Sequence, residues 1–315
     1  PKEAAQIRET IHGTLQLSRA EMRLIDHPAM QRLRNIKQLG LADLAYPGAT
    51  HTRYVHSLGT MHVATRMFEA LTRDYDLAPR DYARLQSTLR LAALFHDLGH
   101  APLSHTPDRF MPPVEELELG GWQAGKAGRR ASHEDYTLKI IVGSDLGDRI
   151  SQLFSDVGVS PEDVATVTAS GRVPRAEASE RFVVNGKNWL PLLRQCVSSE
   201  LDADRMDYLL RDAYYAGVAY GKFDLEWLLE NLQPVDRQGK LTIGLMSRAS
   251  FGFEDYLLSR YHMFLSVYLN HIPIAYEAML ERYHADAQDE VALPADIEAY
   301  LRCDDVYLLS TLRSS

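Results

Sequence analysis

The chain is poor in cysteine, and it lacks an excess of basic residues, a long apolar run and an internal repeat. Only Cys196 and Cys303 are cysteines among its 315 residues. This excludes a disulfide framework and a thiolate zinc cluster, and it predicts a reducing, cytoplasmic setting. No apolar stretch approaches the roughly 20 residues of a membrane-spanning helix, and the first ten residues lack the apolar core of a signal peptide. We therefore expect no membrane partner.

The charge balance is acidic. There are 34 Lys and Arg residues against 43 Asp and Glu residues, which gives a formal net charge of −9. Because neutralisation of phosphates supplies much of the affinity for nucleic acid, broad nucleic-acid binders usually carry a basic surface. We expect no strong nucleic-acid binding, although the overall charge does not exclude a local basic pocket.

Most of the chain shows helical periodicity. The patterns predict helices over 29–39, 57–71, 82–96, 197–213 and 251–283, the last interrupted near Pro273. Asp26 lies where it can cap the first helix ahead of Pro28, and Gly99 follows the third helix at a helix-ending position.

Signals for strands are few. Residues 182–184 and 188–190 flank Asn185-Gly186, a strong hairpin turn, and 241–245 follow a polar turn. The irregular segment 111–132 is either a mobile lid or a plain surface loop, and 169–178 is a second loop. No linker divides the chain, so we predict a mainly α helical bundle with a small β-hairpin appendage.

Histidine and aspartate supply the candidate metal ligands. A buried helix ends in LRLAALFH and is followed by Asp97, so that His96 and Asp97 need a partner that compensates their burial. His56 begins another helix, and ELDADRMDYLLRD supplies further carboxylates. Two imidazoles and two carboxylates suit a divalent cation with positions left for water and phosphate. Spacing alone does not choose between Asp204 and Asp207.

These residues lie in stretches that together resemble a known family. The stretches are QRLRNIKQLG, YPGATHTRYVHSLG, LFHDLGHAPLSH, HED and ELDADRMDYLLRDAYYAG. In this order they resemble the HD-domain phosphohydrolases, and among these the deoxynucleoside triphosphate (dNTP) triphosphohydrolases, a group that includes the vertebrate SAM-and-HD-domain enzyme and bacterial relatives. The resemblance implies an HD-type domain over 1–280. Residues 281–315 resemble the start of a C-terminal helical extension, in a chain that is either naturally short or trimmed.

The resemblance also implies an activity and a set of site residues. The activity is metal-dependent hydrolysis of a dNTP to a deoxynucleoside and inorganic triphosphate, in a homo-oligomer. The implied metal ligands are His56, His96, Asp97 and Asp204, and the catalytic candidates are His100, His105, His133 and Asp212. The implied substrate-binding residues are Gln38, Leu39, Arg53, Arg205, Tyr208, Arg260 and Tyr268. Asp26, Gln31 and Arg34 match a site for a nucleotide activator.

Several alternatives stay open. The ligand set does not distinguish Mn, Fe, Mg, Zn, Ni and Co, and a second Mg could accompany the substrate phosphates. Phe264, Ser266 and Asn270 stand where the vertebrate relative has basic residues, which admits a smaller phosphorylated substrate. The alternatives are therefore hydrolysis of a nucleoside monophosphate, a nucleotide-derived metabolite or a cyclic phosphodiester, and, in a different class, non-catalytic sensing of a nucleotide or nucleic acid.

Overall fold

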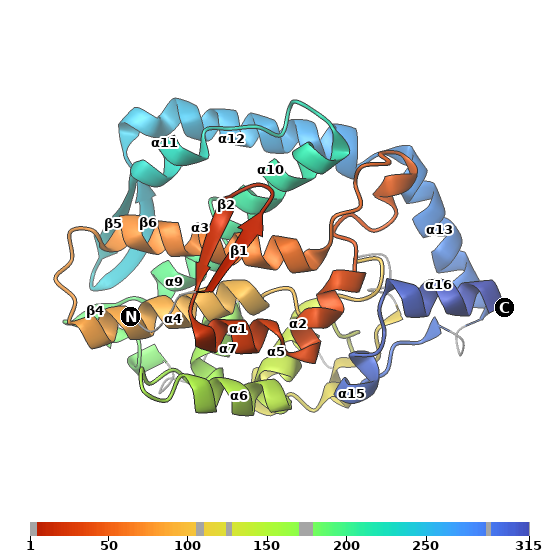
Figure 1. Cartoon of the computed structure of the whole chain (residues 1–315), viewed down its shortest axis with the longest axis horizontal. Coiled ribbons are helices and arrows are strands. Elements are labelled where there is room, and N and C mark those ends of the chain that lie inside the picture. The colour runs from red at the N-terminus through yellow and green to blue at the C-terminus, as the bar shows by residue number, and fades with distance from the viewer. Residues whose placement is uncertain (1–4, 105–109, 124–127, 170–178, 288–290, 315) are drawn as a thin grey trace.

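The long helix α3 (Arg53–Thr72) crosses the middle of the molecule and packs against α4 and α10 (Figure 1). The computed structural model describes residues 5–104, 110–123, 128–169, 179–287 and 291–314. The other helices are α1 Arg19–Ile25, α2 Pro28–Arg32, α4 Pro79–Phe95, α5 His133–Gly143, α6 Asp145–Leu153, α7 Pro161–Thr168, α9 Leu190–Val197, α10 Ala203–Ala216, α11 Leu225–Glu230, α12 Ser250–Met263, α13 His271–Asp286, α15 Ile297–Tyr300 and α16 Asp305–Ser314. The prediction of a mainly α fold is confirmed.

The strands form two small sheets. They are β1 Ala5–Glu9, β2 Gly13–Leu17, β3 Val183–Val184, β4 Lys187–Asn188, β5 Leu232–Arg237 and β6 Lys240–Leu245. The antiparallel pair β1–β2 lies next to α3 and α10, and the second sheet has the order β3-β4-β6-β5 (Figure 1). The predicted Asn185-Gly186 turn is confirmed, because both residues have positive φ and connect β3 to β4. Sequence patterns missed β1, β2 and β5.

Two predicted helices match the structure closely, because their apolar faces are buried. The pattern over 57–71 lies within α3, and α4 ends at Phe95 with His96 at its C-cap. Gly99 does not end this helix. A Cβ at Gly99 would lie 2.0 Å from a carbonyl oxygen of α5, so glycine is needed there for close packing.

The other predicted helices are shorter or divided. The helix predicted over 29–39 stops at a 3₁₀ turn, Leu33–Asn35, because the following backbone instead pairs with the segment before α3. His27 caps α2, and Asp26 ends α1. The helix predicted over 197–213 begins only at Ala203, because Val197 ends α9 and the Asp202 carboxylate accepts the Arg205 N–H at the start of α10.

The interruption near Pro273 is confirmed, with its break a few residues earlier. A π-helical turn, Phe264–Tyr268, follows α12, and the Asn270 side chain caps α13. Pro273 lies in the first turn of α13, where its missing N–H costs no helical hydrogen bond.

The irregular segment 111–132 is packed against the molecule where the structure describes it. In the described part of 111–132, Met111, Val114 and Leu117 are buried, which favours a packed surface loop over a lid. Tyr300 stacks on Tyr136 with ring centroids 3.8 Å apart, so the segment after residue 280 packs onto the bundle. The division at residue 280 stays a prediction.

Among the helices in the described ranges, none combines the length and apolar character that crossing a membrane requires.

Candidate metal centre and substrate cavity

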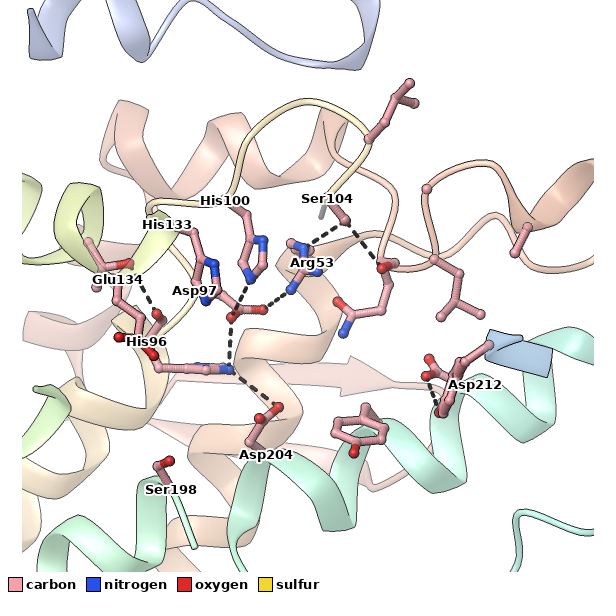
Figure 2. Close-up of a pocket in the computed structure, with 18 of the residues that line it drawn as sticks. Arg53, His96, Asp97, His100, Ser104, His133, Glu134, Ser198, Asp204 and Asp212 are labelled. Atoms are coloured by element: carbon pink, nitrogen blue, oxygen red, sulfur yellow. Dashed lines mark hydrogen bonds and ion pairs between the residues drawn. The ribbon is translucent and has the colours of Figure 1, made fainter. Parts of the chain in front are cut away.

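Three helices bring the candidate metal ligands together. His56 lies in the first turn of α3, His96 and Asp97 follow α4, and Asp204 lies in the first turn of α10. His56 Nε2 is 3.3 Å from His96 Nε2 and 3.0 Å from Asp204 Oδ1, and His96 Nε2 is 3.5 Å from the same oxygen. Asp97 adds an oxygen 3.3 Å from His96 Nε2. Figure 2 shows His96, Asp97 and Asp204 pointing toward one another.

The hydrogen bonds on the far side of each imidazole indicate which nitrogen faces the cluster as an acceptor. His96 Nδ1 lies 2.7 Å from the carbonyl oxygen of Ala93, and His56 Nδ1 lies 2.7 Å from Asp207 Oδ2. Both partners are acceptors, so each Nδ1 carries the proton and each Nε2 presents a lone pair. Two such lone pairs facing two carboxylates require a shared positive charge. A divalent cation meets that requirement, and the donor set of imidazole and carboxylate fits Mn, Fe, Zn, Ni or Co, or Mg with water.

The pKa shifts of the histidines and of Asp204 also indicate that the cluster needs positive charge. Burial alone would lower the pKa of His56, but the carboxylates of Asp204 and Asp207 outweigh it and raise that pKa to about 10. Burial would also lower the pKa of His96, and Asp97 and Asp204 raise it instead. Conversely, burial would raise the pKa of Asp204, and the two imidazoles hold it below its usual value. The cluster therefore favours bound positive charge, whether protons or a cation supply it.

The structure separates the two aspartates that spacing left open. Asp204 faces both Nε2 atoms, whereas Asp207 is fully buried on the opposite side of His56 and bonds its Nδ1. Asp204 therefore lies with the candidate metal ligands, and Asp207 bonds the far side of the candidate ligand His56. Asp207 also pairs with the Arg211 guanidinium through two 2.8 Å hydrogen bonds.

His96, Asp97 and Asp204 line a cavity of about 510 Å³, and His56 lies buried behind them. Many of the predicted site residues line it. They are Gln38, Leu39, Arg53, His96, Asp97, His100, His133, Asp204, Tyr208, Asp212 and Tyr268. Asp204, Tyr208 and Asp212 are spaced four residues apart, which places them on one face of α10, and all three line the cavity. Figure 2 shows Asp204 and Asp212 on this helix. His105 lies outside the described residues.

Arg53 is the predicted phosphate-binding residue that reaches the cavity. Its guanidinium bonds the Asp97 carboxylate, and its Nε donates to Ser104 Oγ at 2.9 Å. Leu103 and Ser104 both have positive φ, a conformation that places the Ser104 hydroxyl between Arg53 and the backbone carbonyl of Lys37. Figure 2 shows Arg53 beside Asp97 and Ser104.

The other two predicted arginines do not line this cavity. Arg205 contacts Asp202 and Glu200, and Arg260 donates to Glu200 at 2.9 Å. Glu200 is largely exposed, so both guanidinium groups are held toward the surface near the cavity. Of the three arginines that the resemblance implies as substrate-binding residues, Arg53 therefore lines the cavity, whereas Arg205 and Arg260 do not.

Two histidines form a stacked pair in the cavity wall. The rings of His100 and His133 lie 4.0 Å apart between centroids and are inclined by 13°. His100 Nε2 is 3.2 Å from Asp97 Oδ1. Burial, together with the neighbouring charges of Arg53 and His133, holds the pKa of His100 well below its usual value.

At the other end of the cavity, Asp212 is held by two groups. Tyr268 donates its hydroxyl to Asp212 Oδ2 at 2.8 Å, and His51 Nε2 lies 2.7 Å from Oδ1. Sequence reasoning assigned His51 no role. The predicted activator residues lie elsewhere on the surface, where Arg34 donates to the Gln31 side chain and stacks over Tyr54.

The chain matches the family model described as "HD domain" over residues 53–169. It belongs to the HD-domain superfamily. An uncharacterized protein of Methanocaldococcus jannaschii is 34% identical over 309 residues, covering 98% of this chain and 55% of that protein. The human deoxynucleoside triphosphate triphosphohydrolase SAMHD1 is 25% identical over 332 residues, covering 98% of this chain and 51% of the human protein. The Dictyostelium discoideum homolog of that enzyme is 25% identical, covering 94% of this chain and 52% of its own length.

Among solved structures, a hypothetical protein from Aquifex aeolicus matches with a TM-score of 0.73 and 30% identity, covering 99% of this chain and 72% of that one. The chain spans about half the length of the curated relatives it matches. Membership of the HD-domain superfamily and similarity to proteins named deoxynucleoside triphosphate triphosphohydrolase are the basis of the activity proposed below.

Proposed function

We propose that the chain hydrolyses deoxynucleoside triphosphates to deoxynucleosides and inorganic triphosphate. The observation that carries the proposal is the convergence of His56, His96 and Asp204 beside a cavity large enough for a nucleotide, whose wall includes His96 and Asp204. The similarity to proteins named deoxynucleoside triphosphate triphosphohydrolase supports this choice of substrate.

The metal would be held by His56, His96, Asp97 and Asp204, with a second Mg accompanying the substrate phosphates. When bound, a divalent cation polarises phosphoryl oxygens and lowers the pKa of water. Arg53 is held at the same wall and donates to the phosphate oxygens on which negative charge develops. Hydrolysis forms a bond between a water oxygen and the α-phosphorus and breaks the bond to the 5′ oxygen.

The departing 5′ oxygen needs a proton, and the histidines of this wall are the candidates for its transfer. His100 and His133 line the cavity as a stacked pair, and His105 belongs to the same proposal. Asp212 is the further catalytic candidate. Its carboxylate is fixed by two hydrogen bonds and so presents a defined acceptor to a sugar hydroxyl or to the proton-transfer path.

Close packing gives the proposed preference for deoxyribose. Gln38, Leu39, Tyr208 and Tyr268 line the cavity, and Tyr268 bonds Asp212. The Tyr208 and Tyr268 rings meet edge to face, with centroids 6.1 Å apart. A sugar held against these rings has little room for a 2′-hydroxyl, whose burial without a hydrogen-bond partner would be costly.

One observation favours a second candidate. All three predicted arginines pair with carboxylates, but only Arg53 among them lines the cavity and is in place to bind phosphate there. A substrate with fewer phosphates, such as a nucleoside monophosphate, needs fewer cations. In the triphosphate proposal, Arg205 and Arg260 must exchange their carboxylate partners for phosphate oxygens.

One assay separates these candidates. The metal-loaded protein is incubated with dNTPs, ribonucleoside triphosphates and nucleoside monophosphates, and the products are resolved by ion-exchange chromatography. Inorganic triphosphate with a deoxynucleoside supports the first proposal. Orthophosphate released from monophosphates supports the second, and tight nucleotide binding without turnover identifies a sensor.

A nucleotide activator and a homo-oligomer complete the proposal. Asp26, Gln31 and Arg34 lie close to Tyr54, where Arg34 and Gln31 already bond each other. A carboxylate, an amide and a guanidinium together offer the donors and acceptors that a purine base requires. Adding guanine nucleotides should raise the rate of dNTP hydrolysis and the molecular mass in solution, and Arg34→Ala should abolish both effects.

A further inference from the structure

The N-terminal hairpin contributes side chains to the far side of the metal centre. His12 lies in the turn between β1 and β2, and its Nε2 is 2.7 Å from Asp207 Oδ1. Asp207 Oδ2 in turn lies 2.7 Å from Nδ1 of the candidate ligand His56. His12 and Asp207 are 195 residues apart, so only the folded chain creates this chain of contacts. Figure 1 shows the hairpin beside α3 and α10.

Asp207 is bonded on every side. Its two oxygens take hydrogen bonds from His12, from His56 and, through two nitrogens, from Arg211. A carboxylate has about four acceptor positions, and all four are used here. Its orientation, and through it the orientation of the His56 ring, is therefore fixed by groups that do not touch the cavity.

Glu9 ties the hairpin to the same network. Its Oε1 accepts a 2.5 Å hydrogen bond from Arg211 Nη1, and its Oε2 accepts the backbone N–H of His12 at 2.9 Å. Glu9, Asp207 and Arg211 are all buried, so two carboxylates face one guanidinium away from water. The N–H groups of the two histidines offset the remaining negative charge. Removing any one donor leaves a buried acceptor without its partner.

The packing of α3 against α10 is built around this network. A Cβ at Gly59 would lie 1.9 Å from Asp207 Oδ1 and 2.4 Å from Arg211 Nη2. Gly59 is one turn after His56 on the same helix, so the absence of a side chain there lets Asp207 reach the imidazole.

We propose that His12 is a positioning residue for the metal centre, acting through Asp207 on His56. The N–H group of His12 holds Asp207 in the position that keeps the proton on His56 Nδ1 and its Nε2 lone pair toward the metal. Groups that orient metal-ligating histidines typically change metal affinity by about 10–100-fold. The inference rests on the proposed metal site, but it concerns metal retention and is independent of which substrate the protein hydrolyses.

Two amide variants of the full chain test this role. The amide nitrogen of His12→Gln is separated from Cβ by as many bonds as the imidazole Nε2, so it still reaches Asp207. The amide of His12→Asn is one methylene shorter and does not. His62 is the matched control, because its ring lies 5.4 Å from that of His12, whereas the four hydrogen bonds that fill the acceptor positions of Asp207 come from His12, His56 and Arg211. His62→Asn removes the same volume next to the network.

The readouts are the Co²⁺ dissociation constant by competition with a chelator, the visible spectrum of bound Co²⁺ and the melting temperature without metal. His12→Asn should weaken Co²⁺ binding about 10–100-fold and shift the Co²⁺ bands. His12→Gln and His62→Asn should stay within about threefold of the unmodified chain. All four proteins should melt cooperatively without metal.

Three outcomes would overturn the inference. His12→Asn could bind Co²⁺ as tightly as the unmodified chain, or His62→Asn could lose as much affinity as His12→Asn. The third outcome is that His12→Gln binds Co²⁺ as weakly as His12→Asn. In each case the unmodified chain still binds Co²⁺, so the proposed function survives. If the unmodified chain binds no Co²⁺, Mn²⁺ or Fe²⁺, the metal site fails and the inference fails with it.

Discussion

Replacing Asp204 with asparagine should remove metal binding while leaving the fold intact. Asp204 Oδ1 is within 3.5 Å of both imidazole Nε2 atoms, and about a third of the side chain is exposed. The substitution keeps the shape of the side chain and removes the charge that attracts a cation. Since groups that merely orient ligands are worth about 10–100-fold in affinity, loss of a ligand carboxylate should cost about 100-fold or more.

The size of the effect follows from linkage. At a metal concentration 100 times the dissociation constant, binding stabilises the fold by about 2.7 kcal/mol. For 315 residues, the entropy of unfolding is about 0.66 kcal/mol per degree, so metal should raise the melting temperature by about 4 °C. With affinity reduced 100-fold, the same metal concentration gives about 0.4 kcal/mol and a rise of less than about 1 °C.

Differential scanning fluorimetry with and without Mn²⁺ measures this difference. Glu200→Gln is the matched control, because this exposed carboxylate lies near α10 and pairs with Arg260, outside the cluster. It should keep the full metal-induced rise. If Asp204→Asn also keeps that rise, the metal does not bind where the two histidines and Asp204 converge, and our account of the site is wrong.

Three further predictions concern other parts of the structure. Gly99→Ala should lower the free energy of unfolding of the metal-free protein by about 1–3 kcal/mol in urea denaturation, because its Cβ would meet backbone 2.0 Å away; unchanged stability would refute the packing argument. Arg53→Met should reduce kcat/KM for the substrate by more than tenfold, because it removes a cation from the cavity wall. The same substitution leaves the buried Asp97 without its guanidinium partner, so the metal-free protein should lose about 3–5 kcal/mol of stability. If Arg53→Met is as stable as the unmodified chain, Arg53 does not stabilise Asp97 as a buried ion pair. Cys196 and Cys303 are buried, and burial raises the pKa of both thiols, so a maleimide should label neither thiol in the native protein and both in urea.

Sequence patterns predicted well those helices in which apolar residues recur at helical spacing along most of the length. The apolar run that ends at His96 and the amphipathic stretch after His56 bury their faces along most of their length. Predictions failed where a single side chain redirects the backbone. Asp202 starts a new helix in what reads as one continuous pattern, because its carboxylate satisfies an N–H group at the start of α10.

The candidate site could be predicted in part for a similar reason. Periodicity correctly places Asp204, Tyr208 and Asp212 along one face of α10. It cannot assign Asp207, because the direction of that carboxylate depends on Arg211 and on a hairpin 195 residues away. His12 and His51 were missed since each acts through an aspartate that is distant in the sequence. The available signal for His12 was a histidine in a glycine-containing turn, Ile11-His12-Gly13, directly after β1.

The partners of the arginines also depend on tertiary structure. Spacing put Arg205 beside a ligand and Arg260 on a late helix, but it could not show that Glu200 lies between them. Because a largely exposed ion pair contributes little stability, phosphate can displace Glu200 from these guanidinium groups at small cost. Whether Arg205 and Arg260 can bind substrate phosphates therefore depends on the displacement of Glu200, whose position between them comes from the tertiary structure.

The most direct test of the central claim is hydrolysis of dGTP by the Mn²⁺-loaded protein in water enriched in ¹⁸O, with the products analysed by mass spectrometry. Attack of water on the α-phosphorus predicts one ¹⁸O in inorganic triphosphate and none in deoxyguanosine. Label in orthophosphate or pyrophosphate would place the attack on another phosphorus and contradict the account.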